Sequence, residues 1–191
     1  ADDAFMTEHY TTADEPALQT RLEGLMARLQ AVSPYPDESV RVRIIGKPKD
    51  PAVMSGHEDG AFASSTTIYV GIEELKRSPP PTDDELLWTL GHEMTHIHRD
   101  HYAKALLADE SLKKWQETQW TMGEDPAPID EGYRSAIQSR ARKSQLGGYY
   151  KEQELESDRF GTLQALSAGA KPDGIRATFE RMRKDEAAGE A

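Results

Sequence analysis

Two histidines stand four positions apart in the stretch GHEMTH, and a glutamate follows the first of them. Residues four apart lie on one face of an α-helix, so the imidazoles of His92 and His96 can reach the same ion. This is a common way to supply two ligands of a tetrahedral zinc site. Glu93 is turned by about 100° from His92, which places its carboxylate beside the ion but outside the coordination shell. Glu93 is therefore the candidate general base, able to accept a proton from a zinc-bound water.

A catalytic zinc site needs three protein ligands and one open position, so a third ligand must come from elsewhere in the chain. The metzincin pattern would require a glycine at position 99 and a histidine at position 102, where this chain has Arg99 and Tyr102. That class is excluded. On a continuous helix, His98 and His101 would point to other faces than the one that carries the two ligand histidines.

The third ligand is expected in the stretch ELESD, because the chain contains no cysteine that could supply a thiolate. Glu154 and Asp158 are four residues apart and share one face of a helix, whereas Glu156 lies on the face opposite Asp158. We therefore predict Glu154 as the third ligand. Asp158 is expected to accept a hydrogen bond from the outer nitrogen of a ligand histidine.

Breaker residues followed by a capping pattern mark the start of the helix that carries GHEMTH. The stretch SPPPTDDE ends in a capping box, with Thr82 as N-cap and Glu85 three residues later, so we expect the helix to begin at about residue 83. Apolar residues follow at helical spacing: Leu86, Leu87, Leu90, Met94 and Ile97. GHEMTH should therefore lie in the middle of a largely buried helix.

The glutamate stretch belongs to a second helix, expected over residues 151–166 and ended near Gly169. Near the start of the chain, Asp14 can cap a helix that has Pro16 in its first turn. Further helical segments are expected at 102–121, in the basic stretch YRSAIQSRARKSQL, and in a last amphipathic helix with Ile175, Phe179 and Met182.

Two stretches have the composition of β-strands. Residues 39–46 alternate apolar and charged side chains, and residues 65–71 are rich in β-branched and aromatic ones. Together with the helices, they predict an α+β fold with a small sheet. We expect one domain over residues 1–191, with flexible ends at 1–13 and 184–191.

The charge balance argues against polyanionic partners. The chain has 23 Lys and Arg against 34 Asp and Glu, a net charge of -11, which repels nucleic acids and anionic membrane surfaces. No stretch approaches the roughly 20 apolar residues of a membrane-spanning helix. The sequence begins with an alanine, which fits cleavage of a signal peptide and artificial trimming of the chain equally well. We expect an exported, periplasmic or secreted protein, with a cytoplasmic location as the alternative.

GHEMTH followed by ELESDRFG resembles the gluzincin zinc metallopeptidases related to HtpX, BepA and the CAAX prenyl proteases. The similarity runs from about Asp59 to Phe179. Within it, GAFASSTTIYVGIEEL resembles the strand and turn before the active-site helix, and SAGAKPDGIRATFERM the segment after the glutamate helix. The membrane-spanning helices of some members have no counterpart in this chain.

The resemblance implies a zincin-type fold, in which a small mixed β-sheet packs on an active-site helix and a glutamate helix. It implies one zinc ion per chain, held by His92, His96 and Glu154, with Glu93 as the general base and Asp158 behind a ligand histidine. It also places a strand at the rim of the cleft, to which substrate would add as a further strand. The residues of this predicted substrate strand are Thr66, Thr67, Ile68, Tyr69 and Val70.

These features together predict a zinc-dependent endopeptidase that hydrolyses extended or unfolded proteins. The alternative is a latent or chaperone-like zinc-containing module that binds such chains and seldom cleaves them. Tyr150, four residues before Glu154, is a candidate hydrogen-bond donor to the oxyanion, with a packing role as the alternative. Arg176 could replace an oxyanion-binding residue that family members often have, and His57 could occupy the open zinc position.

Overall fold

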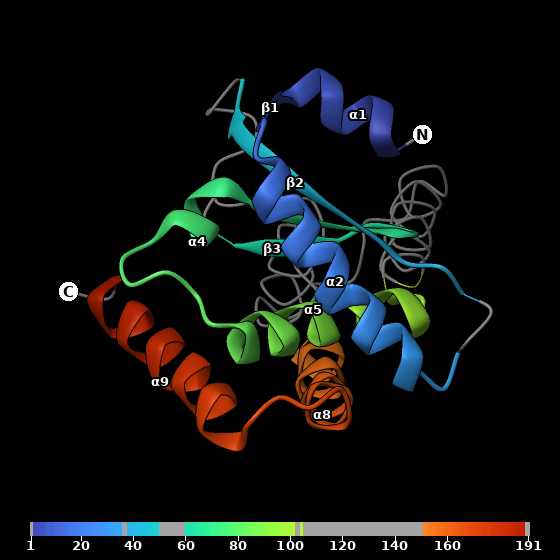
Figure 1. Ribbon diagram of the computed structural model, residues 1–191, viewed down its shortest axis with the longest axis vertical. Helices are drawn as coiled ribbons and strands as arrows, with labels where there is room; N and C mark the ends of the chain where they lie inside the picture. The colour runs from blue at the N-terminus through green and yellow to red at the C-terminus, as the bar shows by residue number, and fades with distance from the viewer. Residues whose placement is uncertain (1, 36–37, 50–59, 102–103, 105–150, 190–191) are drawn as a thin grey trace, which may run out of the picture.

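Residues 2–35, 38–49, 60–101, 104 and 151–189 are described by the computed structural model (Figure 1). Over these ranges the chain forms a four-stranded sheet and several helices, a mixed α+β architecture as predicted. The elements in chain order are α1 (Asp2–His9), β1 (Tyr10–Thr12), α2 (Pro16–Val32), β2 (Arg41–Pro48), β3 (Ala61–Ala63), β4 (Thr67–Gly71), α4 (Ile72–Lys76), α5 (Asp83–His98), α8 (Lys151–Ser167) and α9 (Pro172–Gly189).

The sheet has the strand order β1-β2-β4-β3 and mixes both pairing directions. The two central strands, β2 and β4, run parallel, with Arg41 opposite Thr67 and Ile45 opposite Gly71. Antiparallel strands flank them: β1 pairs with β2, and β3 pairs with β4. Among the described residues, the short strands β1 and β3 are therefore the outermost strands of the sheet.

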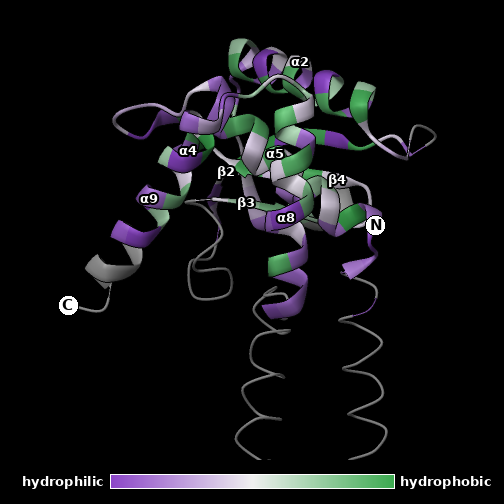
Figure 2. Cartoon of the chain, turned by 90° about the horizontal axis from the view of Figure 1, so that it is seen from below, coloured by the Kyte–Doolittle hydropathy of each residue, from purple (hydrophilic) through white to green (hydrophobic). Residues whose placement is uncertain are grey.

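Both faces of the sheet are covered, which explains why every residue of β4 is buried. Ile68 and Val70 face the main core, where they meet the apolar sides of α2 and α5. Tyr69 points the other way and packs with Met6, Tyr10 and other residues of a second, smaller cluster. Buried apolar residues of α2 and α5 form the main core together with those of β2 and β4. In contrast, α9 is largely hydrophilic (Figure 2).

The part of β2 that β1 does not reach is covered by glutamines of α2. The side-chain amide of Gln19 donates to the Val42 carbonyl at 2.8 Å and accepts from the Ile44 N–H at 3.2 Å. Gln30 donates at 2.8 Å to the carbonyl of Val40, the residue just before β2. These two side chains therefore replace a neighbouring strand along this stretch of backbone.

Several elements differ from the sequence-based predictions. The first dozen residues, expected to be loose, form α1 and β1, and α9 continues through most of 184–191 to Gly189. The N-cap of α2 is Glu15 rather than Asp14, and no side chain caps this helix. The short elements β3 and α4 were not predicted. The helical predictions at 102–121 and in YRSAIQSRARKSQL fall almost entirely outside the described residues.

The helices expected around GHEMTH and ELESD are confirmed. α5 begins at Asp83, behind the capping box, and α8 covers Lys151–Ser167, with Gly169 beyond it at a φ of 91°. This left-handed conformation is the usual helix-ending role of glycine. Among the described helices, none combines the length and the apolar composition that crossing a membrane requires.

Candidate metal centre

The start of α5 is fixed by the reciprocal bonds of the capping box. The Glu85 N–H donates to Thr82 Oγ1 at 3.3 Å, and the Thr82 N–H donates to Glu85 Oε2 at 2.9 Å. Glu85 also accepts from Arg77 at 2.6 Å, which ties the start of α5 to the end of α4. Satisfied backbone donors at this end set the helix register that places His92 and His96 on the buried side.

Two glycines let α8 approach α5 backbone to backbone. A Cβ atom at Gly161 would lie 2.5 Å from the His92 nitrogen, and one at Gly91 would lie 2.9 Å from the Gly161 carbonyl oxygen. Both distances are shorter than any side chain permits, so only glycine allows this crossing. The close approach brings the acidic face of α8 onto the face of α5 that carries His92.

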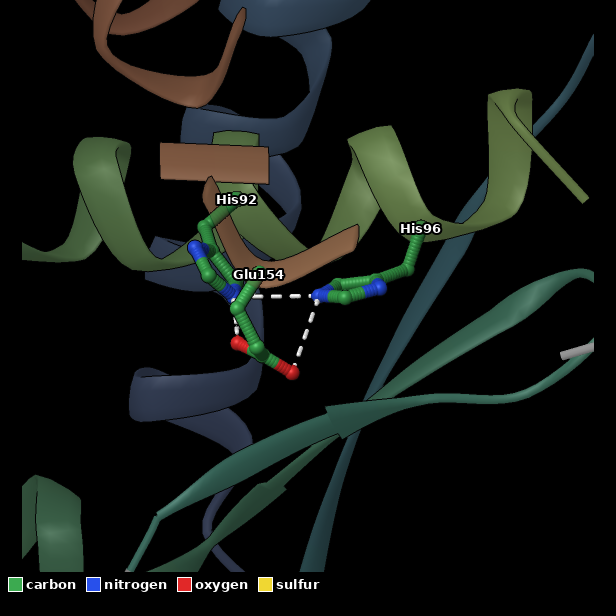
Figure 3. A group of neighbouring side chains, drawn as sticks. All are labelled: His92, His96 and Glu154. Atoms are coloured by element: carbon green, nitrogen blue, oxygen red, sulfur yellow. Dashed lines mark hydrogen bonds and ion pairs between the residues drawn. The ribbon is translucent and has the colours of Figure 1, made fainter. Parts of the chain in front are cut away.

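Three side chains converge at this crossing (Figure 3). His92 Nε2 lies 3.1 Å from His96 Nε2 and 3.3 Å from Glu154 Oε2, and His96 Nε2 lies 3.9 Å from Glu154 Oε1. Ligand atoms at the usual zinc distances in a tetrahedron stand roughly 3.3 Å apart. The three donors chosen from the sequence are thus spaced as a zinc ion requires, with Glu154 a little more distant from His96.

The contact of His92 with Asp158 engages Nδ1, so Nε2 is the nitrogen that can bind a metal. Its Nδ1 lies 3.0 Å from Asp158 Oδ1, and because a carboxylate only accepts, Nδ1 carries the proton. The lone pair of a neutral His92 is then on Nε2, which faces Glu154 and His96. Asp158 therefore lies where the sequence predicted it, behind a histidine of the cluster.

The electrostatics of the cluster favour one bound positive charge. Burial disfavours the charged form of His92, but the hydrogen bonds that it donates to Asp158 and Glu154 outweigh this effect and raise the pKa of His92 to about 10. Burial and the neighbouring His92 and His101 lower the pKa of His96 to about 2. The cluster thus holds a cation at His92 and a neutral imidazole at His96, and a divalent metal would satisfy the same carboxylates.

Glu93 lies beside the cluster without belonging to it. It is 7 % exposed, and its Oε2 atom is buried without a hydrogen-bond partner among the described residues. Burial raises the pKa of Glu93 to about 7, with Glu154 adding to the effect and His92 opposing it. The backbone N–H of Ala63 donates to this carboxylate. A buried carboxyl that titrates near neutrality, with one oxygen unpartnered, has the properties of a general base awaiting a water.

The predicted substrate strand is wrong, because β4 is hydrogen-bonded along both sides. Its residues Ile68 to Val70 face β2 on one side and β3 on the other, and Thr66 lies in the turn before the strand. The outer strand on this side of the sheet is β3. Bonds from the Gly71 N–H to the Gly60 carbonyl and from the Ser64 N–H to the Thr67 carbonyl bracket it.

Successive residues of a strand direct their backbone N–H and C=O groups to opposite sides. The two hydrogen bonds that flank β3 therefore determine which of its residues bond to β4. Phe62 bonds towards β4, whereas Ala61 and Ala63 direct their N–H and C=O groups away from it. The bond from Ala63 to Glu93 agrees with this assignment. The outward backbone of β3 therefore lies next to the candidate base.

Two further residues at the cluster were missed. His101 Nδ1 lies 2.9 Å from His96 Nδ1, and His101 Nε2 lies 3.1 Å from Glu156 Oε2. The prediction that His101 and Glu156 point away from the site was wrong. α5 ends at His98, and Asp100 has a φ of 54°, so the left-handed turn brings His101 back against His96. No periodic pattern in the sequence signals such a turn.

The remaining candidates do not join the cluster. Tyr150 and His57 lie outside the described residues. Arg176, considered as an oxyanion residue, pairs with Asp173 at 3.0 Å and Glu180 at 3.7 Å on its own helix. The described part of the chain therefore brings together the candidate ligands and the candidate base, and none of the candidates for the oxyanion joins them.

Comparison with known proteins identifies the family of the chain. The family model described as Peptidase family M48 matches residues 14–182, which include α5 and α8. The chain belongs to peptidase family M48. It is also similar to the metalloprotease LoiP of Escherichia coli (strain K12), with 24% identity over 155 residues. That alignment covers 75% of this chain and 55% of LoiP, so the chain spans about half the length of this relative.

Proposed function

We propose that this M48 domain is a zinc-dependent endopeptidase acting on extended or unfolded protein chains. The observation that carries the proposal is the pairing of three converging donor atoms, at 3.1, 3.3 and 3.9 Å, with a buried carboxyl that has one unpartnered oxygen. A structural metal site has no use for such a carboxyl, whereas hydrolysis by water requires a base at this place.

Each protein group has a distinct part in the proposed reaction. Bound zinc would polarise the scissile carbonyl and acidify the attacking water. Glu93 accepts the proton of that water and delivers it to the leaving amine nitrogen. Asp158 holds His92 in the tautomer that presents Nε2, and Glu154 brings a negative charge to the ligand set. Water is the nucleophile, so no acyl-enzyme forms.

The substrate would bind in extended form along the outer side of β3. Ala61 and Ala63 turn their backbone groups to this side, and Ala63 also bonds Glu93, so a chain paired here would pass the base. Main-chain pairing reads little of the substrate's sequence, which suits unfolded proteins. A strand edge also places no demand on the ends of the substrate, which favours cleavage within a chain.

Cleavage of an unfolded protein such as casein by Glu93→Gln tests the proposal. Loss of a positioned general base should lower the rate by roughly 10² to 10⁴, with zinc content and fold unchanged. Glu152→Gln is the matched control, because Glu152 is an exposed glutamate of α8 and should not affect the rate. If Glu93→Gln cleaves as fast as wild type, the mechanism is wrong. If wild type binds unfolded chains and zinc without cleaving, the domain is a binding module.

A further inference from the structure

The outer nitrogens of the two cluster histidines are held in different ways. Nδ1 of His92 bonds directly to the Asp158 carboxylate. Nδ1 of His96 instead faces Nδ1 of a second imidazole, His101, at 2.9 Å, and Nε2 of His101 lies 3.1 Å from Glu156. On its Nδ1 side, His96 is thus linked to the Glu156 carboxylate through His101. Both rings are 1 % exposed, so water has little access to this contact.

With both imidazoles neutral, only one arrangement of protons satisfies these contacts. Glu156 as a carboxylate only accepts, so Nε2 of His101 carries a proton. Two N–H groups cannot face each other at 2.9 Å, so one of the facing Nδ1 atoms must be an acceptor. If His101 accepts, His96 keeps its proton on Nδ1 and its lone pair on Nε2, where the ligand atoms converge. The opposite assignment would require a doubly protonated His101 buried beside the metal ligands.

Glu156 is itself held in place by Arg99, the residue that follows α5. Its other oxygen lies 3.2 Å from Nε of Arg99, and the guanidinium of Arg99 stacks over the Phe160 ring at 4.6 Å from the ring centre. The partner of His101 is therefore a charge-paired, oriented carboxylate. Three acidic residues of α8, at positions 154, 156 and 158, all face the same histidine cluster, although the middle one does so through His101.

We propose that His101 and Glu156 are positioning residues that fix the orientation and tautomer of His96 for metal binding. This inference rests on the proposed function, since it assigns a role towards the same metal. Neither residue is a metal ligand, because Nδ1 of His101 points at the outer nitrogen of His96. Removal of such an outer partner typically costs 10- to 100-fold in metal affinity.

Chelator competition with zinc and the visible absorption of the cobalt-substituted protein test this role. His101→Leu should lower zinc affinity by roughly 10- to 100-fold and shift the cobalt bands, since His96 would lose its orientation. His101→Gln should restore most of the affinity, because its amide can accept from His96 and donate to Glu156. Glu156→Ala, a partly exposed position, should cost roughly tenfold and covers the case in which His101→Leu does not fold.

Two matched variants separate positioning from packing. His98→Leu also removes a buried histidine from the end of α5, but His98 packs on Tyr35 at 4.7 Å and not on the cluster. It should leave zinc affinity unchanged, as should Glu152→Ala on α8. Wild-type zinc affinity in folded His101→Leu or Glu156→Ala, or equal loss in His101→Leu and His101→Gln, would overturn the proposal. If wild type itself binds neither metal, the proposed function fails first, and the positioning role fails with it.

Discussion

Replacing Gly161 by alanine tests whether the backbone contact between α5 and α8 holds the metal centre together. The new Cβ would lie 2.5 Å from the His92 nitrogen and 2.7 Å from its Cα. Ordinary contact requires about 3.5 Å, so the helices must separate by roughly 1 Å at the crossing. Both partners are helical backbone, and neither can turn aside. Overpacking of this kind costs about 1–3 kcal/mol.

The same displacement should disturb the ligand set. Asp158 and Glu154 lie on α8 one and two turns before Gly161, so they move with it. A zinc site tolerates deviations of about 0.2 Å in its ligand distances. The His92 to Glu154 distance of 3.3 Å cannot absorb a shift several times larger, and we expect zinc affinity to fall at least roughly tenfold.

Thermal unfolding followed by circular dichroism, together with chelator competition, measures both effects. The midpoint of Gly161→Ala should fall by roughly 2–4 °C for each kcal/mol lost. Gly24→Ala on α2 is the control, because a Cβ there would meet no heavy atom within 4 Å. It should be neutral or stabilising by up to about 1 kcal/mol, through helix propensity. Wild-type stability and zinc affinity in Gly161→Ala would show that the crossing is not limited by this contact.

Three other outcomes are expected. Burial raises the pKa of Glu93 from 4.5 to about 7, so the folded metal-free protein loses stability as the pH rises through that interval. In urea denaturation, metal-free Glu93→Gln should therefore have the same free energy of unfolding as wild type near pH 4, and a higher one by ~3 kcal/mol above about pH 8. If the difference between the two proteins did not change with pH, the burial argument would be contradicted. Glu154→Ala, which removes a ligand, should weaken zinc binding in chelator competition far more than Glu156→Ala, and equal losses would show that the ligand is wrongly assigned. Ala61→Pro should raise KM for casein without unfolding the protein, because its N–H points away from β4, whereas Phe62→Pro should break the ladder; an unchanged KM would remove β3 from substrate binding.

The parts of the site that lie on continuous helices could be predicted from the sequence. The capping box fixed the start of α5, and four-residue spacing placed His92 with His96 and Glu154 with Asp158. These are local rules, because a helix determines its own periodicity. The pairing of the two helices followed from the chemical argument that a metal site needs a third ligand and from the family resemblance.

What could not be predicted depends on contacts between distant segments. His101 reaches the cluster through one left-handed residue after the helix end, which a helical periodicity cannot anticipate. The edge position of β3 depends on the strand order, and this three-residue strand is too short to show alternation. The role of Gly161 depends on the packing of α5 against it. In the sequence alone, a glycine within a helix indicates a low helix propensity and not a close contact between two helices.

The coverage of β2 by Gln19 and Gln30 bears on how copies of this protein meet one another. A protein that binds chains by strand addition offers an edge that could also accept the edge of a second copy. Fibrous growth requires two long open edges per molecule, one on each side of the sheet. Here the eight-residue strand β2 is covered by β1 and by the two glutamines, and the outermost strands have three residues each. The described residues therefore offer no long open edge along which edge-to-edge association could propagate, and the strand addition proposed for β3 would not by itself seed an aggregate.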